Sequence, residues 1–377
     1  SDACVWSSLP FARILHAAWP IAIGGLPAGA LKGKYVVCQA DNPPSFYLGT
    51  REFEDVVPRV DLWIARSQEA VAQFRLLGLP VAFVPYAVDP AIFRPLGNAF
   101  EIRHALGIPP KAFVIGNFHR DSEGGDLAKP KKQKGPDLFL EIARRLHARV
   151  PETVVLLAGP RRHWLLRALR AEGVPTVFAG EEPGDEDDYR RNILPRSRLN
   201  ELYQALDVCL VSSRWEGGPY SVLEALAAGR DVVSTPVGVA RDVLPPECRY
   251  TSIDEAVQIL TDLTRGGVPG SFCKEAGQRA AESHGPRAVR DAYLAVYEKL
   301  PRGGVSMTSA LASAFHAAAS QFGTCKSSDL HQDGEWLREI RAHNAEADTG
   351  VIEYNFDSDR RELLRTAASI RALRISA

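Results

Sequence analysis

Two glutamates, Glu216 and Glu224, stand on either side of a glycine-rich turn in the stretch SSRWEGGPYSVLEALAAGR (212–230). Glycine lacks a Cβ and adopts positive φ at little cost, so the Gly-Gly-Pro turn (217–219) can approach a ligand closely. A helix is expected to begin near Ser221, and the unpaired N–H groups of a first helical turn favour phosphate oxygens.

The two carboxylates would then bind hydroxyl groups at the two ends of such a ligand. Glu224, about one turn into the expected helix, can accept hydrogen bonds from both hydroxyls of a ribose. Glu216 precedes the turn and can accept them from a sugar beyond the phosphates. The pattern suits an elongated ligand of sugar, diphosphate and ribose. The alternative is a plain strand–turn–helix connection with a solvated glutamate at each end.

The elements around this turn are expected to alternate between short apolar strands and amphipathic helices. The strands are almost continuously apolar, which is typical of parallel sheets covered by helices on both faces. This alternation predicts an α/β protein with doubly wound parallel sheets. The expected strands cover 34–39, 61–66, 81–86, 112–118, 153–159, 175–180, 207–212 and 231–236. The expected helices include 67–78, 135–150, 198–207, 221–229 and 286–300.

The composition limits the class of protein. The chain has 377 residues, enough for two domains that each bury a core. Its net charge of −1 creates no field that would attract nucleic acid or an anionic membrane. Its six cysteines form no Cys-x-x-Cys pair, which argues against a zinc site and for a reducing, cytoplasmic setting. No apolar run approaches the ~20 residues that cross a bilayer.

The phrase around the two glutamates, LDVCLVSSRWEGGPYSVLEALAAGRDVVSTPVG (206–238), resembles a known signature. It is similar to the Glu-x7-Glu donor-binding motif of the GT4 family of retaining glycosyltransferases, whose fold is called GT-B. Two further segments look like family phrases, VIGNFHRD…KKQKGPDLFLEIARRL (114–146) and VDLWIARSQEAVAQFRLLGLPVAFVPYAVDPAIFRP (60–95). Together the matching segments cover roughly residues 34–300, in the family's order and spacing.

The resemblance implies two Rossmann-like domains that face a cleft. We expect an N-terminal acceptor-side domain in 1–95 and a nucleotide-sugar donor-binding domain in 96–284. A crossing helix and linker would follow in 285–304, then a mostly helical C-terminal extension of unknown role in 305–377. Family members usually carry several strands ahead of the one matching 34–39, whereas about thirty residues precede it here. We therefore expect a first domain that is truncated or divergent.

Carried over residue by residue, the resemblance implies roles for the site. Arg120 and Lys134 would face the donor diphosphate, because fixed cations stabilise the charge that develops on a leaving nucleoside diphosphate. Glu224 would hold the ribose and Glu216 the donor sugar. No metal or other cofactor would be required. The predicted backbone contacts come from Gly217 and Gly218 towards the sugar and from Tyr220 and Ser221 towards the phosphates, whereas Pro219 offers no amide.

Several positions leave alternatives open. An insertion between Arg120 and Lys134 leaves open which lysine meets the phosphate, and Lys134 is favoured because it directly precedes Gly-Pro-Asp and a helix. The lysines in question are Lys129, Lys131, Lys132 and Lys134. Gln39 and Asp41 are candidate pocket residues, because they occupy the place where family members often carry a histidine. His119 is another candidate, although a lone histidine near a strand end is more often simply exposed.

An acidic run, GDEDDYRR (184–191), contains the kind of Asp-Glu-Asp triplet that holds a divalent metal in the other major glycosyltransferase fold. It follows the expected strand 175–180 in what reads as a loop. A solvated surface is therefore favoured over a metal site.

The sequence thus predicts a glycosyltransferase that moves a sugar from a nucleoside-diphosphate sugar to an unidentified acceptor, with retention of the anomeric configuration. The acceptor is a glycan, a lipid-linked molecule or a small molecule, nucleic acid is not a partner, and peripheral contact with the inner face of a membrane is left open. Two alternatives remain. One is a nucleotide-sugar-binding protein with little or no transferase activity, which the short first domain keeps open. The other is a GT-B-fold nucleotide-sugar epimerase, against which the Glu-x7-Glu phrase argues.

Overall fold

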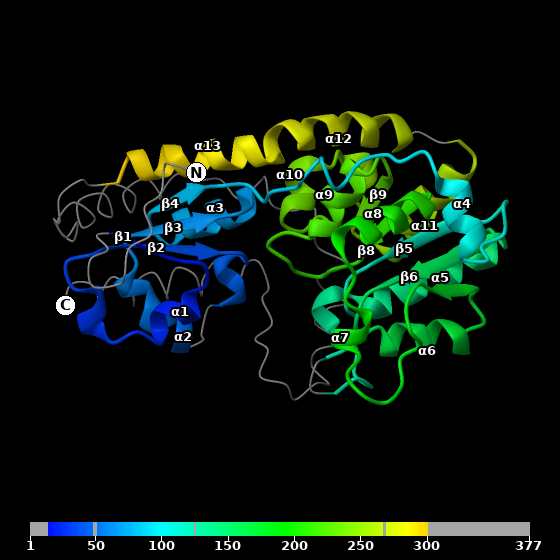
Figure 1. The fold of residues 1–377 in the computed structure, drawn as a ribbon, viewed down its shortest axis with the longest axis horizontal. Coiled ribbons are helices and arrows are strands. Elements are labelled where there is room, and N and C mark those ends of the chain that lie inside the picture. Colours follow the sequence, from blue (N-terminus) through cyan, green and yellow to red (C-terminus); the bar gives the residue numbers. More distant parts are fainter. Residues whose placement is uncertain (1–13, 48–50, 124–125, 267–268, 301–377) are drawn as a thin grey trace. The chain divides into compact units, whose positions relative to one another are not determined.

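The computed structural model describes residues 14–47, 51–123, 126–266 and 269–300. They form two compact units, which are drawn in Figure 1. One unit takes in the described residues up to Pro85 together with those from Arg290 onward, and the other is Tyr86–Val289. The predicted C-terminal extension, 305–377, lies outside the described residues.

The first unit is built on a four-stranded parallel sheet in the order β1-β2-β3-β4. Its strands are β1 (Ile14–Ala17), β2 (Tyr35–Ala40), β3 (Leu62–Ala65) and β4 (Val81–Phe83), and its helices include α1 (Pro20–Gly24), α2 (Arg51–Val56) and α3 (Gln68–Leu76). Ser67 caps α3, because its side chain accepts a hydrogen bond from the N–H of Ala70 at 3.2 Å. The fully buried rings of Trp63 and Phe74 stack with their centroids 5.0 Å apart.

The second unit is built on a five-stranded parallel sheet in the order β7-β6-β5-β8-β9. Its strands are β5 (Phe113–Asn117), β6 (Thr153–Leu157), β7 (Thr176–Phe178), β8 (Val208–Val211) and β9 (Asp231–Ser234). Its helices are α4 (Ala99–Ala105), α5 (Pro136–Arg149), α6 (His163–Ala171), α7 (Tyr189–Asn192), α8 (Arg196–Ala205), α9 (Tyr220–Ala227), α10 (Val239–Val243), α11 (Ile253–Thr264), α12 (Pro269–His284) and the start of α13 (Pro286–Glu298).

Successive residues of the second sheet point to opposite faces and enter two separate hydrophobic clusters. Val114 packs into the cluster that contains residues of α9 and α12, whereas Ile115 packs into the cluster that contains residues of α5 and α6. Figure 1 shows these helix pairs on opposite sides of the sheet. This is the doubly wound arrangement that continuously apolar strands predict.

All eight predicted strands are present, with ends that shift by up to three residues. Strand β1 was not predicted, and it supplies one strand of the sheet ahead of β2. None of the helices that the structure describes is long and apolar enough to cross a membrane.

The strand order places a topological switch point at the carboxyl ends of β5 and β8. From β5 the chain runs outward through β6 and β7, then returns to the other side of β5 to form β8 and β9. The chain therefore leaves β5 towards α5 and β8 towards α9, which pack on opposite faces of the sheet. Ligands of open α/β sheets bind at such points.

Candidate functional site

The site forms where the loops after β5 and β8 meet. Lys134 ends the loop after β5, and Glu216 lies in the turn after β8. Their side chains form an ion pair across 82 positions of sequence. Both are largely buried, with side-chain exposures of 16% for Lys134 and 12% for Glu216.

Lys134 reaches this position because the backbone next to it is fixed to the end of β8. Gly135 has φ +59, and a Cβ at this position would overlap the carbonyl oxygen of Ser212. The Ser212 hydroxyl donates hydrogen bonds to the carbonyl oxygens of Gly135 at 2.8 Å and Lys134 at 3.2 Å. Glycine at 135 is therefore required by both the left-handed backbone and the lack of space.

Arg214 provides a second attachment between the same two loops. Its backbone N–H donates to the carbonyl oxygen of Gln133 at 2.9 Å. Its guanidinium binds both carboxylate oxygens of Asp137, on the first turn of α5, at 2.7 and 2.5 Å. A bidentate pair of this kind fixes orientation as well as distance. The two loops thus behave as one rigid surface around Lys134 and Glu216.

The glycine-rich turn is confined on both sides. A Cβ at Gly218 would overlap the ring of Tyr86, which packs edge-on against the ring of Tyr220 with the centroids 4.8 Å apart. Gly238 has φ 48, and a Cβ there would overlap the carbonyl oxygens of Glu216 and Gly217. Gly238 was not predicted from the sequence as part of the site. Glycine is needed at position 238 because the loop after β9 packs directly on the loop after β8.

Tyr220 and Ser221 are the first two residues of α9, as predicted for a helix start behind the turn. Pro219 occupies the N-cap and provides no side-chain cap. Glu224 follows on the same helix and accepts a hydrogen bond from the hydroxyl of Tyr203 at 3.0 Å. Burial raises the pKa of Glu224, while Tyr203 and then Arg196 oppose that shift. Tyr203, on α8, was not identified from the sequence.

One carboxylate oxygen of Glu216 is available for a ligand. Lys134 contacts Oε1, whereas the buried Oε2 has no hydrogen-bond partner among the residues that the structure describes. Buried acceptors are almost always paired in folded proteins. An unpaired carboxylate oxygen beside a confined turn is therefore a natural acceptor for hydroxyl groups of a bound molecule.

Positive charge gathers around Lys134. Burial lowers the pKa of Lys134 to about 7, and the nearby charges of Arg120 and Lys131 add to the effect. The Glu216 carboxylate opposes this shift, because it favours the charged ammonium. Burial, followed by the charges of Lys134 and Arg162, lowers the pKa of His119 well below its usual value. An anion bound here would relieve the repulsion among these cations.

Three of the four lysines that the sequence offers, among which it favours Lys134, have different ion-pair partners. Lys129 pairs with Asp126 at 3.5 Å, and Lys131 pairs with Glu123 at 3.6 Å. Lys134 is the one that meets Glu216. His119 is half-buried rather than exposed, and Arg120 is exposed.

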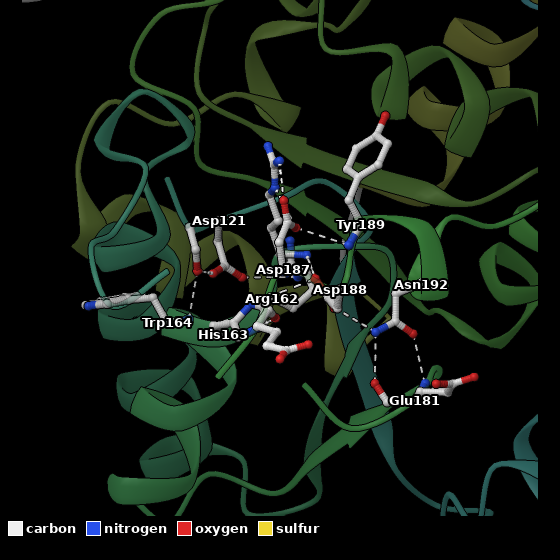
Figure 2. A network of polar contacts seen from close by, with 12 residues as sticks. Asp121, Arg162, His163, Trp164, Glu181, Asp187, Asp188, Tyr189 and Asn192 are labelled. Atoms are coloured by element: carbon white, nitrogen blue, oxygen red, sulfur yellow. Dashed lines mark hydrogen bonds and ion pairs between the residues drawn. The ribbon is translucent and has the colours of Figure 1, made fainter. Parts of the chain in front are cut away.

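The acidic run after β7 is exposed as expected at Asp185, Glu186 and Asp187, but not at Asp188. Asp188 is buried, with 1% exposure, and accepts hydrogen bonds from the N–H of Arg161 at 2.8 Å and from the side chain of Asn192 at 2.6 Å. Asp187 binds the guanidinium of Arg161 at 3.0 and 2.6 Å. The contact between Asp188 and Asn192 is drawn in Figure 2. The prediction of a solvated surface is wrong for Asp188, which is buried, whereas Asp187 is exposed as predicted and pairs with the cation that the loop after β6 brings to it. No group of three His, Cys, Asp or Glu side chains suited to a metal occurs within the described ranges.

Gln39 and Asp41 lie in the first unit, whereas the other predicted site residues lie in the second. Gln39 donates a hydrogen bond to Asp41 at 2.9 Å and accepts one from the Tyr293 hydroxyl at 2.6 Å. Arg66 donates to the same hydroxyl at 2.8 Å. These side chains form a polar cluster beyond the carboxyl ends of β2 and β3.

Comparisons with known proteins identify related glycosyltransferases. Residues 125–256 match the sequence model of the family described as Glycosyl transferases group 1. The lipopolysaccharide core biosynthesis mannosyltransferase LpsB of Rhizobium meliloti is 28% identical over 194 residues, which are 50% of this chain and 49% of LpsB. D-inositol 3-phosphate glycosyltransferase 2 of Catenulispora acidiphila is 31% identical over 200 residues, 49% of this chain and 42% of that protein.

This chain is similar to GT4-type glycosyltransferases over the matched segments. It spans about half the length of the curated relatives that it matches. Among solved structures, Anabaena HepE in complex with UDP-glucose superposes with a TM-score of 0.61 at 16% identity, covering 76% of this chain and 79% of HepE. Sucrose-phosphate synthase of Thermosynechococcus elongatus superposes with a TM-score of 0.59 at 15% identity, covering 76% of this chain and 73% of the synthase. The predicted fold of two Rossmann-like domains, called GT-B, is confirmed.

Proposed function

We propose that this protein transfers a sugar from a nucleoside-diphosphate sugar to a hydroxyl-bearing acceptor, with retention of the anomeric configuration. The observation that carries the proposal is the Lys134–Glu216 ion pair at the switch point of the second sheet. It places a cation suited to a diphosphate beside a carboxylate whose second oxygen has no partner within the described chain.

Donor binding would redistribute the contacts of this pair. The diphosphate would lie between Lys134, Arg120 and the first turn of α9, where fixed positive charge and N–H groups favour it. The sugar would bind to the Glu216 carboxylate in place of the ammonium. The ribose would meet Glu224, whose position the Tyr203 hydroxyl fixes.

The transfer step follows from charge development. As the glycosidic bond breaks, negative charge grows on the leaving diphosphate, and fixed cations stabilise that charge more than the ground state. The acceptor hydroxyl would attack from the face that the diphosphate leaves, passing its proton to the β-phosphate oxygen. We propose that the cations and the helix start replace a metal in this step.

The first donors and acceptors to test follow from the similar proteins. Anabaena HepE has been crystallised with UDP-glucose and with UDP and glucose, so UDP-sugars are the first donors to test. The curated relatives are named for a mannosyltransferase and for a D-inositol 3-phosphate glycosyltransferase. Sugar and cyclitol hydroxyls, with and without a phosphate, are therefore the first acceptors to test.

A nucleotide-sugar-binding protein with little transferase activity is the second candidate. The small first unit favours it, because the structure describes a sheet of only four strands there. An acceptor would need surfaces beyond those of the donor-side unit. Binding of a donor without turnover in every acceptor mixture would support this candidate.

The proposal is tested by incubating the protein with UDP-, GDP- and TDP-sugars and measuring the nucleoside diphosphate released, with and without acceptors and EDTA. Glu216→Gln should reduce release at least about 100-fold, because a buried hydrogen-bonded carboxylate is lost from the transition state. Glu247→Gln, at an exposed glutamate in the same unit, is the matched control and should release at the wild-type rate. Release that survives Glu216→Gln, or that requires a divalent metal, would contradict the proposal.

A further inference from the structure

A fully buried arginine, Arg162, lies beside the segment that carries His119 and Arg120. It is the residue before α6, in the loop after β6, and its side chain has 0% exposure. Burying a guanidinium is costly unless other groups compensate its charge and its hydrogen-bond donors. Its partners therefore indicate why it is there.

The partners of Arg162 are the two ends of one short segment. Its Nη2 donates a hydrogen bond to the side-chain oxygen of Asn117 at 2.7 Å. Its Nε lies 3.1 Å from Oδ2 of Asp121, which is also buried. Asn117 and Asp121 flank the three residues Phe118, His119 and Arg120. One guanidinium thus holds both ends of the segment that presents Arg120.

Each end of the segment has a further attachment. The side-chain amide of Asn117 donates to the carbonyl oxygen of Leu210, on β8, at 3.3 Å. Oδ1 of Asp121 accepts from the Ser122 hydroxyl at 3.0 Å and from the N–H of Leu165, on α6, at 3.2 Å. Asn117 is therefore fixed to β8 and Asp121 to the start of α6, and Arg162 contacts both of these residues.

The acidic run holds Arg161, the residue before Arg162, in place. Arg161 has φ 58, the one positive φ at a residue other than glycine in the described parts of the chain. Such a conformation persists only where the surroundings fix it. Asp188 accepts a hydrogen bond from the N–H of Arg161, and Asp187 binds the Arg161 guanidinium. The carbonyl oxygen of Arg161 accepts hydrogen bonds from the N–H groups of Asp121 and Ser122, both at 3.1 Å. Figure 2 shows these aspartates beside Arg162 and Asp121.

We propose that Arg162 is a positioning residue for donor binding, and that Asp187 and Asp188 brace it. Arg162 fixes the segment 117–121 so that Arg120 meets the donor diphosphate without first being ordered. This inference rests on the proposed function, because it assigns Arg120 to the diphosphate. It gives the acidic run a role that requires no metal, through contacts within the protein.

A thermodynamic cycle with UDP as the probe tests the inference. The variant Asp121→Asn/Arg162→Met removes both members of the buried pair, so that neither charge remains alone. It is made in the wild-type chain and in Arg120→Ala, and the Kd of UDP is measured by calorimetry. A matched control, Arg170→Met/Glu182→Gln, removes an exposed ion pair of the same type that α6 makes, with 2.7 Å between its atoms.

We expect Arg120→Ala to weaken UDP binding about 10- to 100-fold, the range for a hydrogen bond to a charged group. The Asp121→Asn/Arg162→Met pair should weaken it about 10-fold in the wild-type chain and have no further effect in Arg120→Ala, because the two changes then remove the same interaction. The control pair should leave the Kd unchanged. A purely structural role for Arg162 would give the same loss in both backgrounds, and that result would overturn the inference.

Two further outcomes are decisive. If Arg120→Ala leaves UDP binding unchanged, Arg120 does not contact the diphosphate, and the inference is wrong with it. If Arg120→Ala and the Asp121→Asn/Arg162→Met pair weaken UDP binding additively, only the positioning role of Arg162 is overturned. If the buried double variant does not fold, Asp187→Ala replaces it, since Asp187 is partly exposed and lies outside the core. We expect a smaller loss of UDP binding from Asp187→Ala that again disappears in Arg120→Ala, and an equal loss in both backgrounds would overturn the inference.

Discussion

The affinity for a nucleotide sugar should fall as the pH rises above 7, because Lys134 loses its proton in that range. Burial, followed by the charges of Arg120 and Lys131, lowers the pKa of Lys134 to about 7 in the free protein, while the paired Glu216 carboxylate opposes that shift. A bound diphosphate favours the ammonium and raises this pKa again. Above pH 7 the donor must therefore bind together with a proton, whereas below pH 7 the proton is already present.

The size of the effect follows from that pKa. Each pH unit above the pKa of the free protein lowers the affinity about tenfold, as long as the bound form stays protonated. Between pH 7 and pH 9 the Kd of a nucleotide sugar should rise by one to two orders of magnitude, or roughly 2 kcal/mol. The diphosphate diester itself keeps a constant charge over this range. His119 stays neutral throughout, because its pKa lies well below 6.5.

Calorimetry between pH 6 and pH 9, in buffers with different ionisation enthalpies, measures both the Kd and the protons taken up. We expect uptake to approach one proton per site between pH 8 and pH 9. Lys134→Arg should abolish both the uptake and the pH dependence, because arginine stays charged. Lys131→Arg, in the same loop, should retain them. A Kd that stays constant to pH 9 in the wild-type protein would refute this reasoning.

Two further predictions concern the turn and the ribose contact. Gly218→Ala should weaken donor binding and lower the unfolding temperature, because the added Cβ would overlap the ring of Tyr86. Both effects should be absent in Gly184→Ala, where no atom lies within 4 Å of an added Cβ. Equal melting curves for the two variants would contradict the confined turn. Glu224→Gln should reduce the preference for UDP over 2′-deoxy-UDP by about 10-fold, the range expected for a hydrogen bond to a charged group. An unchanged preference in competitive binding would remove Glu224 from the ribose site.

The sheets were predictable because their signal is local. Runs such as TVVLLAG and DVCLVS are apolar on both faces, and this pattern alone indicates a buried parallel strand. Strand β1 was missed because it has only four residues and one of them is His16. Helix α6 was missed because two arginines and a histidine precede its apolar residues. The predicted extension after 304 lies outside the described residues.

The site was predictable where one stretch of chain carries it and not where it depends on pairing between loops. Glu216, the turn and Glu224 fall within nine residues, so their order along a helix start could be read directly. The contact of Tyr203 with Glu224 requires α8 to pack beside α9. The pairing of Asp187 with Arg161 spans 26 positions and exists because β7 lies beside β6. No spacing rule in the sequence encodes such a contact.

The most direct test of the central claim is a crystal structure of the protein with a nucleotide sugar bound. We expect the diphosphate beside Lys134 and the first turn of α9, the ribose hydroxyls at Glu224, and a sugar hydroxyl within hydrogen-bond distance of the Glu216 carboxylate. A donor bound elsewhere, with the Lys134–Glu216 ion pair still intact, would contradict the proposed site.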